Sequence, residues 1–186
     1  MARRTYQLLI ILSAITFLVL PFVSTFNEFL TAVIMKIQLY TFIQDIIVPI
    51  EVRMVGAILQ YFFGIQTSVS SQSLYLQSAG RVLSVYISWN CIGWQSVILF
   101  VFTLIVGLQG PYTIRSKILC LLIGFQGTIL VNLARIVLVC LVALYWGYLP
   151  AIVFHDYGGT IFILLWLVLF WYLSLIHISE PTRQAE

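Results

Sequence analysis

Three side chains of this sequence form a candidate set of nucleophile, base and cation. Cys91 lies in "SWNCIGWQS", Arg135 in "VNLARIV" and His155 in "FHDYGG". A thiolate can attack a carbonyl carbon, a histidine can take up and return the proton near neutral pH, and a guanidinium can stabilise the oxyanion that develops. The chemistry indicated is acyl transfer through a thioester. Hydrolysis and transfer differ only in the final nucleophile, and the residues leave both open.

The residues around Cys91 predict the start of a helix. Asn90 is a favoured N-cap residue, so we expect Cys91 at the first helical position. The positive end of the helix dipole favours the thiolate there. Trp89 and Trp94 suit the depth of a membrane interface. Taken alone, however, a cysteine is more often a small apolar side chain, so its interpretation depends on the other two residues.

Arg135 lies in an apolar run, "GTILVNLARIVLVCLVALYW". A central arginine in a membrane span costs about 2.5–3.5 kcal/mol on insertion scales, so a partner is required. Asn132 precedes Arg135 by three positions on the same helix face and could share its ligand or orient it. The alternative is a structural arginine that reaches the interface. Asp156 and Tyr157, in turn, are candidate orienting partners for His155.

The composition identifies an integral membrane protein of all-α class. Of the 186 residues, 62% are hydrophobic and 8% are charged, and the mean hydropathy is +1.08. The nine basic and six acidic residues form no tract that would bind nucleic acid. Cys120 and Cys140 are interpreted as small apolar residues, and the cysteine spacing suggests no disulfide framework. We expect no metal and no cofactor.

Apolar runs predict about four transmembrane helices, at residues 8–23, 92–108, 118–148 and 160–172. Each crosses or nearly crosses a hydrocarbon layer of ~30 Å. The third run would measure about 46 Å as a straight helix, so we expect a tilt, a break near residues 124–127 or a protruding outer end. We expect the first run to be a retained anchor instead of a cleaved signal peptide.

Basic residues predict the orientation of these spans. Arg3 and Arg4 precede the first run, and Arg115 and Lys117 lie in the loop before the third. Under the positive-inside rule both positions are cytoplasmic, so the N-terminus is cytoplasmic and Cys91 lies at the outer side. Arg135 and His155 then fall in the outer halves of neighbouring spans, close enough for one pocket.

Two further segments are interpreted from their patterns. Residues 26–65 mix polar and apolar positions, which favours outer-face interfacial helices, with two short crossings as the alternative. Residues 73–77 and 81–88 predict a small β-hairpin that turns at 79–80. We expect one membrane-embedded domain over residues 1–173. Residues 174–186 resemble translated cloning sequence and are expected to be a non-native tail.

Three segments, "NCIGWQS", "NLAR" and "FHDYGG", resemble in order and context the motifs of the exosortase/archaeosortase membrane transpeptidases over residues 64–172. The resemblance implies that Cys91 is the nucleophile, that Arg135 supports the intermediate or substrate, and that His155 is the acid/base. Asn90, Asn132 and Asp156 are then the supporting residues. The small number of spans is similar to that of compact, archaeal-type members, whereas Ile92 replaces the serine that follows the cysteine in many members.

The resemblance implies a function at the outer face of the cytoplasmic membrane. The enzyme would cleave C-terminal sorting signals of secreted proteins and transfer those proteins to a new anchor. Its partners would be the secreted substrates, membrane lipids and an amine or hydroxyl acceptor such as a lipid, without nucleic acid. Two alternatives stay open: a non-catalytic transport or assembly subunit in which Arg135 forms an interhelical ion pair, and a purely hydrolytic intramembrane cysteine peptidase.

Overall fold

The computed structural model describes residue 25 and residues 28–78, 81–109 and 113–178. The chain forms two compact units, Met1–Phe42 and Ile43–Glu186, which are described separately. In the first unit, residues 28–36 are helical and a short helix, α2, follows at Leu39–Phe42. The second unit contains every residue singled out above as a candidate for catalysis.

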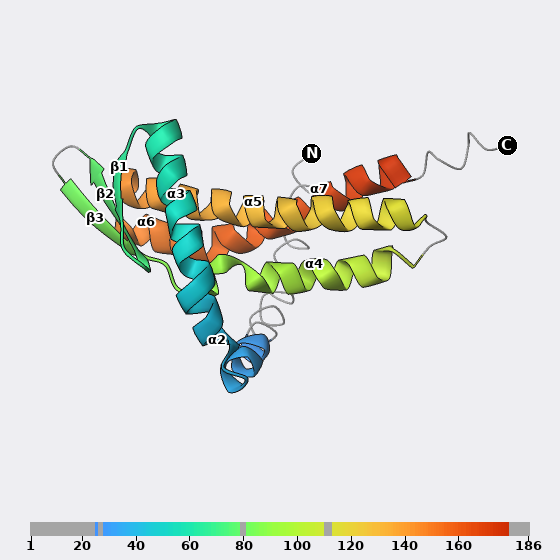
Figure 1. Cartoon of the computed structure of the whole chain (residues 1–186). Helices are drawn as coiled ribbons and strands as arrows, with labels where there is room; N and C mark the ends of the chain where they lie inside the picture. Colours follow the sequence, from blue (N-terminus) through green and yellow to red (C-terminus); the bar gives the residue numbers. More distant parts are fainter. Residues whose placement is uncertain (1–24, 26–27, 79–80, 110–112, 179–186) are drawn as a thin grey trace, which may run out of the picture. The chain divides into compact units, whose positions relative to one another are not determined.

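The second unit consists mainly of helices. Four of its helical elements are long, and shorter helical turns connect them: η1 (Ile43–Ile47), α3 (Val48–Phe63), η2 (Trp89–Ile92), α4 (Trp94–Gly107), α5 (Ile114–Trp146), α6 (Tyr148–Val153), η3 (Phe154–Gly158) and α7 (Gly159–Ile178). Figure 1 shows α4, α5 and α7 running along one another, and both α4 and α7 pack on α5.

Within the described residues, four helical stretches are long and apolar enough to cross a membrane. They are Leu39–Phe63, Trp89–Gly107, Ile114–Trp146 and Tyr148–Ser174. The predicted class, an all-α membrane protein with a small sheet, is therefore confirmed. The last three stretches correspond to predicted spans, whereas the predicted span at 8–23 lies outside the described residues. The final helix continues to Ile178, beyond the predicted end at 172.

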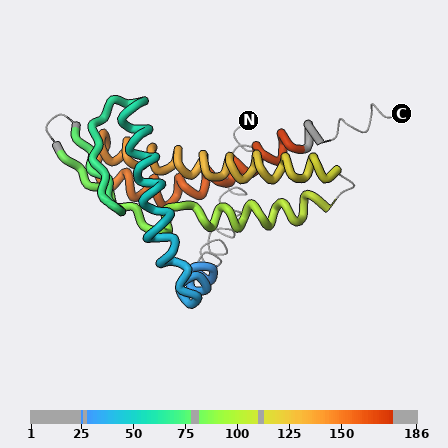
Figure 2. Tube along the Cα trace, in the orientation of Figure 1, coloured from blue at the N-terminus to red at the C-terminus, as the bar shows by residue number. Residues whose placement is uncertain are grey.

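The long helix α5 is unbroken over 33 residues, about 50 Å, so of the three alternatives expected from its length the break near 124–127 is excluded, and a tilt or a protruding end remains. Figure 2 traces α5 as one continuous rod beside α4 and α7. Gly124 lies against the ring of Phe100, and Gly127 lies against the ring of Trp166. A β-carbon at either glycine would overlap these rings. The two glycines therefore serve close helix packing instead of a bend.

The small sheet has three antiparallel strands in the order β1-β2-β3. They are β1 (Gln66–Val69), β2 (Ser73–Ser78) and β3 (Arg81–Tyr86). The predicted hairpin is confirmed as β2 and β3, while its turn at 79–80 lies outside the described residues. Strand β1 was not predicted, because its sequence, "QTSV", is short and mostly polar.

Helix α3 packs one apolar face against the sheet and α5. Val48, Val52, Val55 and Leu59 are fully buried in a cluster with residues of β2 and of the C-terminal half of α5. By length and composition this stretch could cross a membrane. In Figure 1, however, α3 runs across the direction of α4, α5 and α7. That arrangement suits the interfacial position that the sequence predicts.

Candidate active site

The turn that carries Cys91 joins strand β3 to helix α4. Cys91 donates its backbone N–H to the carbonyl of Ser88 over 2.9 Å, within the 3-10 turn η2. Gly93 then adopts a φ of +74°, which ends the turn, and α4 begins only at Trp94. The predicted helix start at Cys91 is therefore wrong. Asn90 lies inside η2 with an exposed side chain and is not an N-cap.

The thiol of Cys91 faces the imidazole of His155. The distance from Cys91 Sγ to His155 Nε2 is 3.4 Å, and Ser88 Oγ lies 3.5 Å from the same sulfur. His155 Nδ1 is 2.9 Å from Asp156 Oδ1. When Nδ1–H donates to this carboxylate, Nε2 is left to accept the thiol proton. His155 and Asp156 both belong to the π-helical turn η3, a helix irregularity that often occurs at functional sites.

Helix α5 contacts the backbone of Cys91. Arg135 Nη2 donates to the Cys91 carbonyl over 2.8 Å, and Asn132 Nδ2 donates to the same oxygen over 3.1 Å. Asn132 Nδ2 also donates to Glu51 Oε1 over 2.7 Å. An amide nitrogen carries two hydrogens, so both are used. Arg135 and Asn132 thus hold the turn that carries Cys91 through its main chain.

Glu51 is a member of this cluster that the sequence interpretation missed. Its exposed fraction is 7%, compared with 8% for Arg135 and 1% for Asn132. A buried carboxylate requires hydrogen bonds or an opposite charge, and Glu51 has both, from Asn132 and from the nearby guanidinium. A signal was present in the sequence: Glu51 shares the apolar face of α3 with Val48 and Val55, where water could not solvate it.

Two glycines cover these polar side chains. A β-carbon on Gly93 would lie 2.7 Å from Asn132 Cγ and Oδ1. A β-carbon on Gly159 would lie 2.7 Å from Arg135 Nη1. Both contacts are shorter than real β-carbons tolerate. The backbone of η2 and the start of α7 can therefore approach Asn132 and Arg135 only because both positions are glycine.

The remaining residues near Cys91 hold the turn from its other side. The rings of Trp89 and Trp94 stack with their centres 5.8 Å apart. Trp89 donates its backbone N–H to Gln44 Oε1 over 2.7 Å. Cys140 is fully buried in the apolar cluster on which Cys91 packs, whereas Cys120 lies apart, with Sγ 3.1 Å from Ser174 Oγ. In the described part of the chain, no three His, Cys, Asp or Glu side chains could hold a metal ion.

The arrangement has the parts needed for acyl transfer. The sulfur has a base within contact distance, and the base has a carboxylate on its second nitrogen. Cys91 is partly exposed, and the side chain of His155 is 39% exposed, so a substrate can reach both. The guanidinium of Arg135 contacts the backbone carbonyl of Cys91 and not its sulfur.

A comparison with protein families finds that the family described as transmembrane exosortase matches residues 2–172. Neither the curated proteins nor the solved structures with which the chain was compared contain a match. The match covers all three segments that hold Cys91, Arg135 and His155.

Proposed function

Because the chain belongs to the transmembrane exosortase family, we propose that it is a membrane cysteine transpeptidase. It cleaves C-terminal sorting signals of secreted proteins and transfers the cleaved protein to a new anchor. The observation that supports this proposal most directly is the 3.4 Å contact between Cys91 Sγ and His155 Nε2, made across 64 positions of the sequence. A thiol and an imidazole at this distance form the nucleophile and base of cysteine-dependent acyl transfer.

The first half of the reaction forms a thioester. His155 Nε2 accepts the proton of the Cys91 thiol, and the thiolate attacks the carbonyl carbon of the scissile peptide bond. The tetrahedral intermediate collapses when the C–N bond breaks, and the imidazolium returns the proton to the departing amine. Asp156 keeps Nδ1 protonated throughout, through its 2.9 Å contact.

The second half of the reaction transfers the acyl group. An amine or hydroxyl acceptor, such as that of a lipid, loses its proton to His155 and attacks the thioester carbon. The C–S bond breaks, and the proton passes from the imidazolium to the sulfur, which restores the thiol. Water in place of the acceptor would give hydrolysis.

We assign Arg135 two linked roles. It positions Cys91 through the carbonyl contact of 2.8 Å, and its charge, 8% exposed, stabilises negative charge that develops at the neighbouring substrate carbonyl. Asn132 supports the first role. Glu51 compensates the buried guanidinium and holds the Asn132 amide, so it belongs to the same machinery.

The orientation in the membrane is also part of this proposal. Arg115 and Lys117, expected in a loop, lie in the first turn of α5 at the end far from the sheet, and the positive-inside rule assigns that end to the cytoplasm. Cys91 lies at the other end of α4, so the reaction takes place at the outer face of the cytoplasmic membrane, with the N-terminus cytoplasmic. A compact, archaeal-type relationship fits the small number of spans.

Replacement of the nucleophile tests the proposal. We expect Cys91→Ala to abolish processing of a co-expressed precursor that carries a C-terminal sorting signal, while the enzyme still inserts into the membrane. Cys120→Ala is the matched control and should remain active, because that thiol lies beside Ser174 and away from the site. The mass of the product C-terminus separates transfer, which leaves an adduct, from hydrolysis, which leaves a free carboxylate. Full processing by Cys91→Ala would refute the proposal and favour a non-catalytic subunit.

A further inference from the structure

Strand β3 forms one edge of the sheet. The order β1-β2-β3 places β2 in the centre, with β1 and β3 outside. The β1 side packs against α3, where Thr67 Oγ1 donates to the carbonyl of Gly56 over 3.3 Å. On the β3 side, no other strand among the described residues pairs with it. The hydrogen-bonding edge of β3 is therefore open to a further strand.

The register identifies which backbone groups point to the open edge. Ile87 donates its N–H to the carbonyl of Gln72 over 2.9 Å, so these opposite residues form a hydrogen-bonded pair. In an antiparallel ladder such pairs alternate with non-hydrogen-bonded pairs. Every second residue of β3 therefore bonds to β2, and Val82, Ser84 and Tyr86 direct their N–H and C=O groups away from it. The side chains of these three residues are also exposed.

The open edge continues into the turn of the nucleophile. Cys91 follows Tyr86 by five positions, which corresponds to at most about 18 Å of extended chain. Ile87, between them, is 2% exposed and holds the end of the strand in the core. A polypeptide that lies along β3 would reach the sulfur within a few residues. This length suits a short motif beside a scissile bond.

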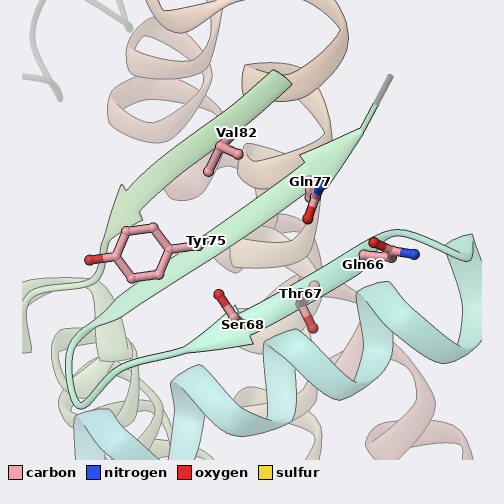
Figure 3. A pocket seen from close by; sticks show the side chains of 6 residues that line it. All are labelled: Gln66, Thr67, Ser68, Tyr75, Gln77 and Val82. Atoms are coloured by element: carbon pink, nitrogen blue, oxygen red, sulfur yellow. The ribbon is translucent and has the colours of Figure 1, made fainter. Parts of the chain in front are cut away.

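The chemistry of the strand also suits a peptide. Sheet edges are commonly protected by charged side chains, proline or a bulge; β3 reads "RVLSVY", so its charge is confined to Arg81 at the first position, and the strand pairs in regular register with β2. The outer face of the sheet is hollowed over β1 and β2, and Val82 is the residue of β3 that borders this hollow (Figure 3). The hollow is lined by uncharged side chains: Gln66, Thr67, Ser68, Tyr75, Gln77 and Val82.

We propose that the open edge of β3 binds the substrate segment next to the scissile bond as an added β-strand. The main chain of Val82, Ser84 and Tyr86 supplies the hydrogen bonds, and long side chains from one face of the added strand extend over Val82 toward the uncharged hollow. The occupant is an extended polypeptide, the substrate of the reaction above, so this inference rests on the proposed function. It explains how a site could select a short motif while it makes few side-chain contacts.

A proline at the central edge position tests strand addition. Ser84→Pro removes the N–H that faces the open edge and places a ring where the added strand would lie, but it takes no hydrogen bond from β2. We expect processing of the signal-bearing precursor to fall at least about tenfold, through a higher KM. The rate at which iodoacetamide alkylates Cys91 should stay within twofold, because the turn itself is unchanged.

The control is the same substitution elsewhere on the sheet. Ser71 occupies the second position of the tight turn closed by the contacts between Ser70 and Ser73, and its φ is not positive. Proline is favoured at that position of a turn. Ser71→Pro should therefore process the precursor within twofold of the wild-type rate. Wild-type processing by Ser84→Pro would overturn the proposal.

If Ser84→Pro also slows the alkylation of Cys91, the substitution has disturbed the fold, and its slow processing no longer reports on strand addition. A cross-linking measurement then tests the proposal. A photoreactive benzophenone side chain introduced at Val82, combined with Cys91→Ala, should cross-link the precursor and not a precursor without its signal. Absence of that cross-link would overturn the proposal. The two hypotheses fail differently: processing by Cys91→Ala refutes the transpeptidase, whereas inactive Cys91→Ala with active Ser84→Pro refutes strand addition alone.

Discussion

Asn132 provides a direct test of how the nucleophile is held, because one amide nitrogen donates to two acceptors. Its Nδ2 lies 2.7 Å from Glu51 Oε1 and 3.1 Å from the carbonyl of Cys91. Asn132→Asp keeps the shape of the side chain and replaces this donor by an oxygen. Both contacts then bring two acceptors together in a site where residue 132 is 1% exposed. A proton taken up by the new carboxyl group at position 132 lets it donate to one of these two acceptors. The other contact still joins two acceptors and is lost.

The expected magnitude follows from these two contacts. A buried group that loses its hydrogen-bond partner costs about 1–3 kcal/mol. If the whole of this free energy raises the barrier of the reaction at Cys91, the loss of one contact lowers the processing rate by about 5- to 150-fold, at about 1.4 kcal/mol per tenfold. We therefore expect Asn132→Asp to process the precursor at least about fivefold more slowly. Alkylation of Cys91 should also change, since its turn loses an anchor.

A double-mutant cycle identifies the contact with Glu51. In Glu51→Gln the side-chain oxygen can still accept from Asn132, so we expect a smaller loss than for Asn132→Asp. In the double variant the new amide at position 51 can donate to the new carboxylate at position 132. That restores one of the two contacts, and processing should recover in part. Recovery cannot be complete, because the bond to the Cys91 carbonyl is still missing.

The assay combines the processing rate, the alkylation rate and the melting temperature of the detergent-solubilised enzyme. Wild-type values for Asn132→Asp in all three would refute the reasoning. If Asn132→Asp melts at the wild-type temperature but processes the precursor slowly, Asn132 positions Cys91 and does not merely stabilise the fold. No recovery in the double variant would show that Asn132 and Glu51 act independently.

Two further substitutions probe the surroundings of the cluster. Gly93→Ala should lower the melting temperature and the processing rate, because its β-carbon would lie 2.7 Å from Asn132 and its φ is +74°. The control is Gly64→Ala, which has a φ of +65° but no atom within 4 Å, so it measures the backbone cost alone, about 1–2 kcal/mol. Equal losses in the two variants would contradict the steric argument. Asp156→Asn should slow processing by no more than about fivefold, because Asp156 is 58% exposed and such ion pairs contribute about 0–1 kcal/mol. A hundredfold loss in the same assay would mean that its charge does more than orient His155.

The sequence pattern predicts much of the fold because its strongest signals are local. Long apolar runs correspond to α4, α5 and α7, and the alternating pattern around residues 73–88 corresponds to two strands. The start of α4 was wrong because a local rule for Asn90 ignored Gly93, whose left-handed φ stops the turn first. The break in α5, one of three alternatives, does not occur because Gly124 and Gly127 serve packing against Phe100 and Trp166.

Three central residues of the candidate site could be predicted from the sequence, but their contacts and a fourth, buried partner, Glu51, could not. Cys91, Arg135 and His155 stood out because each is costly or unusual in its apolar context. That Arg135 contacts the Cys91 carbonyl, and not the sulfur, depends on the relative position of two helices, which no spacing records. Glu51 was missed because residues 26–65 were interpreted only as interfacial helices, although the position of Glu51 falls among buried valines.

The anchoring of Cys91 through its carbonyl has a practical consequence. Arg135 and Asn132 bond to a main-chain atom, which is the same whatever side chain residue 91 carries. An enzyme without the thiol should therefore keep the shape of the turn and lose only its reactivity. Such a variant would retain its substrate uncleaved, and it is the form best suited to isolating the complex and identifying the natural precursor.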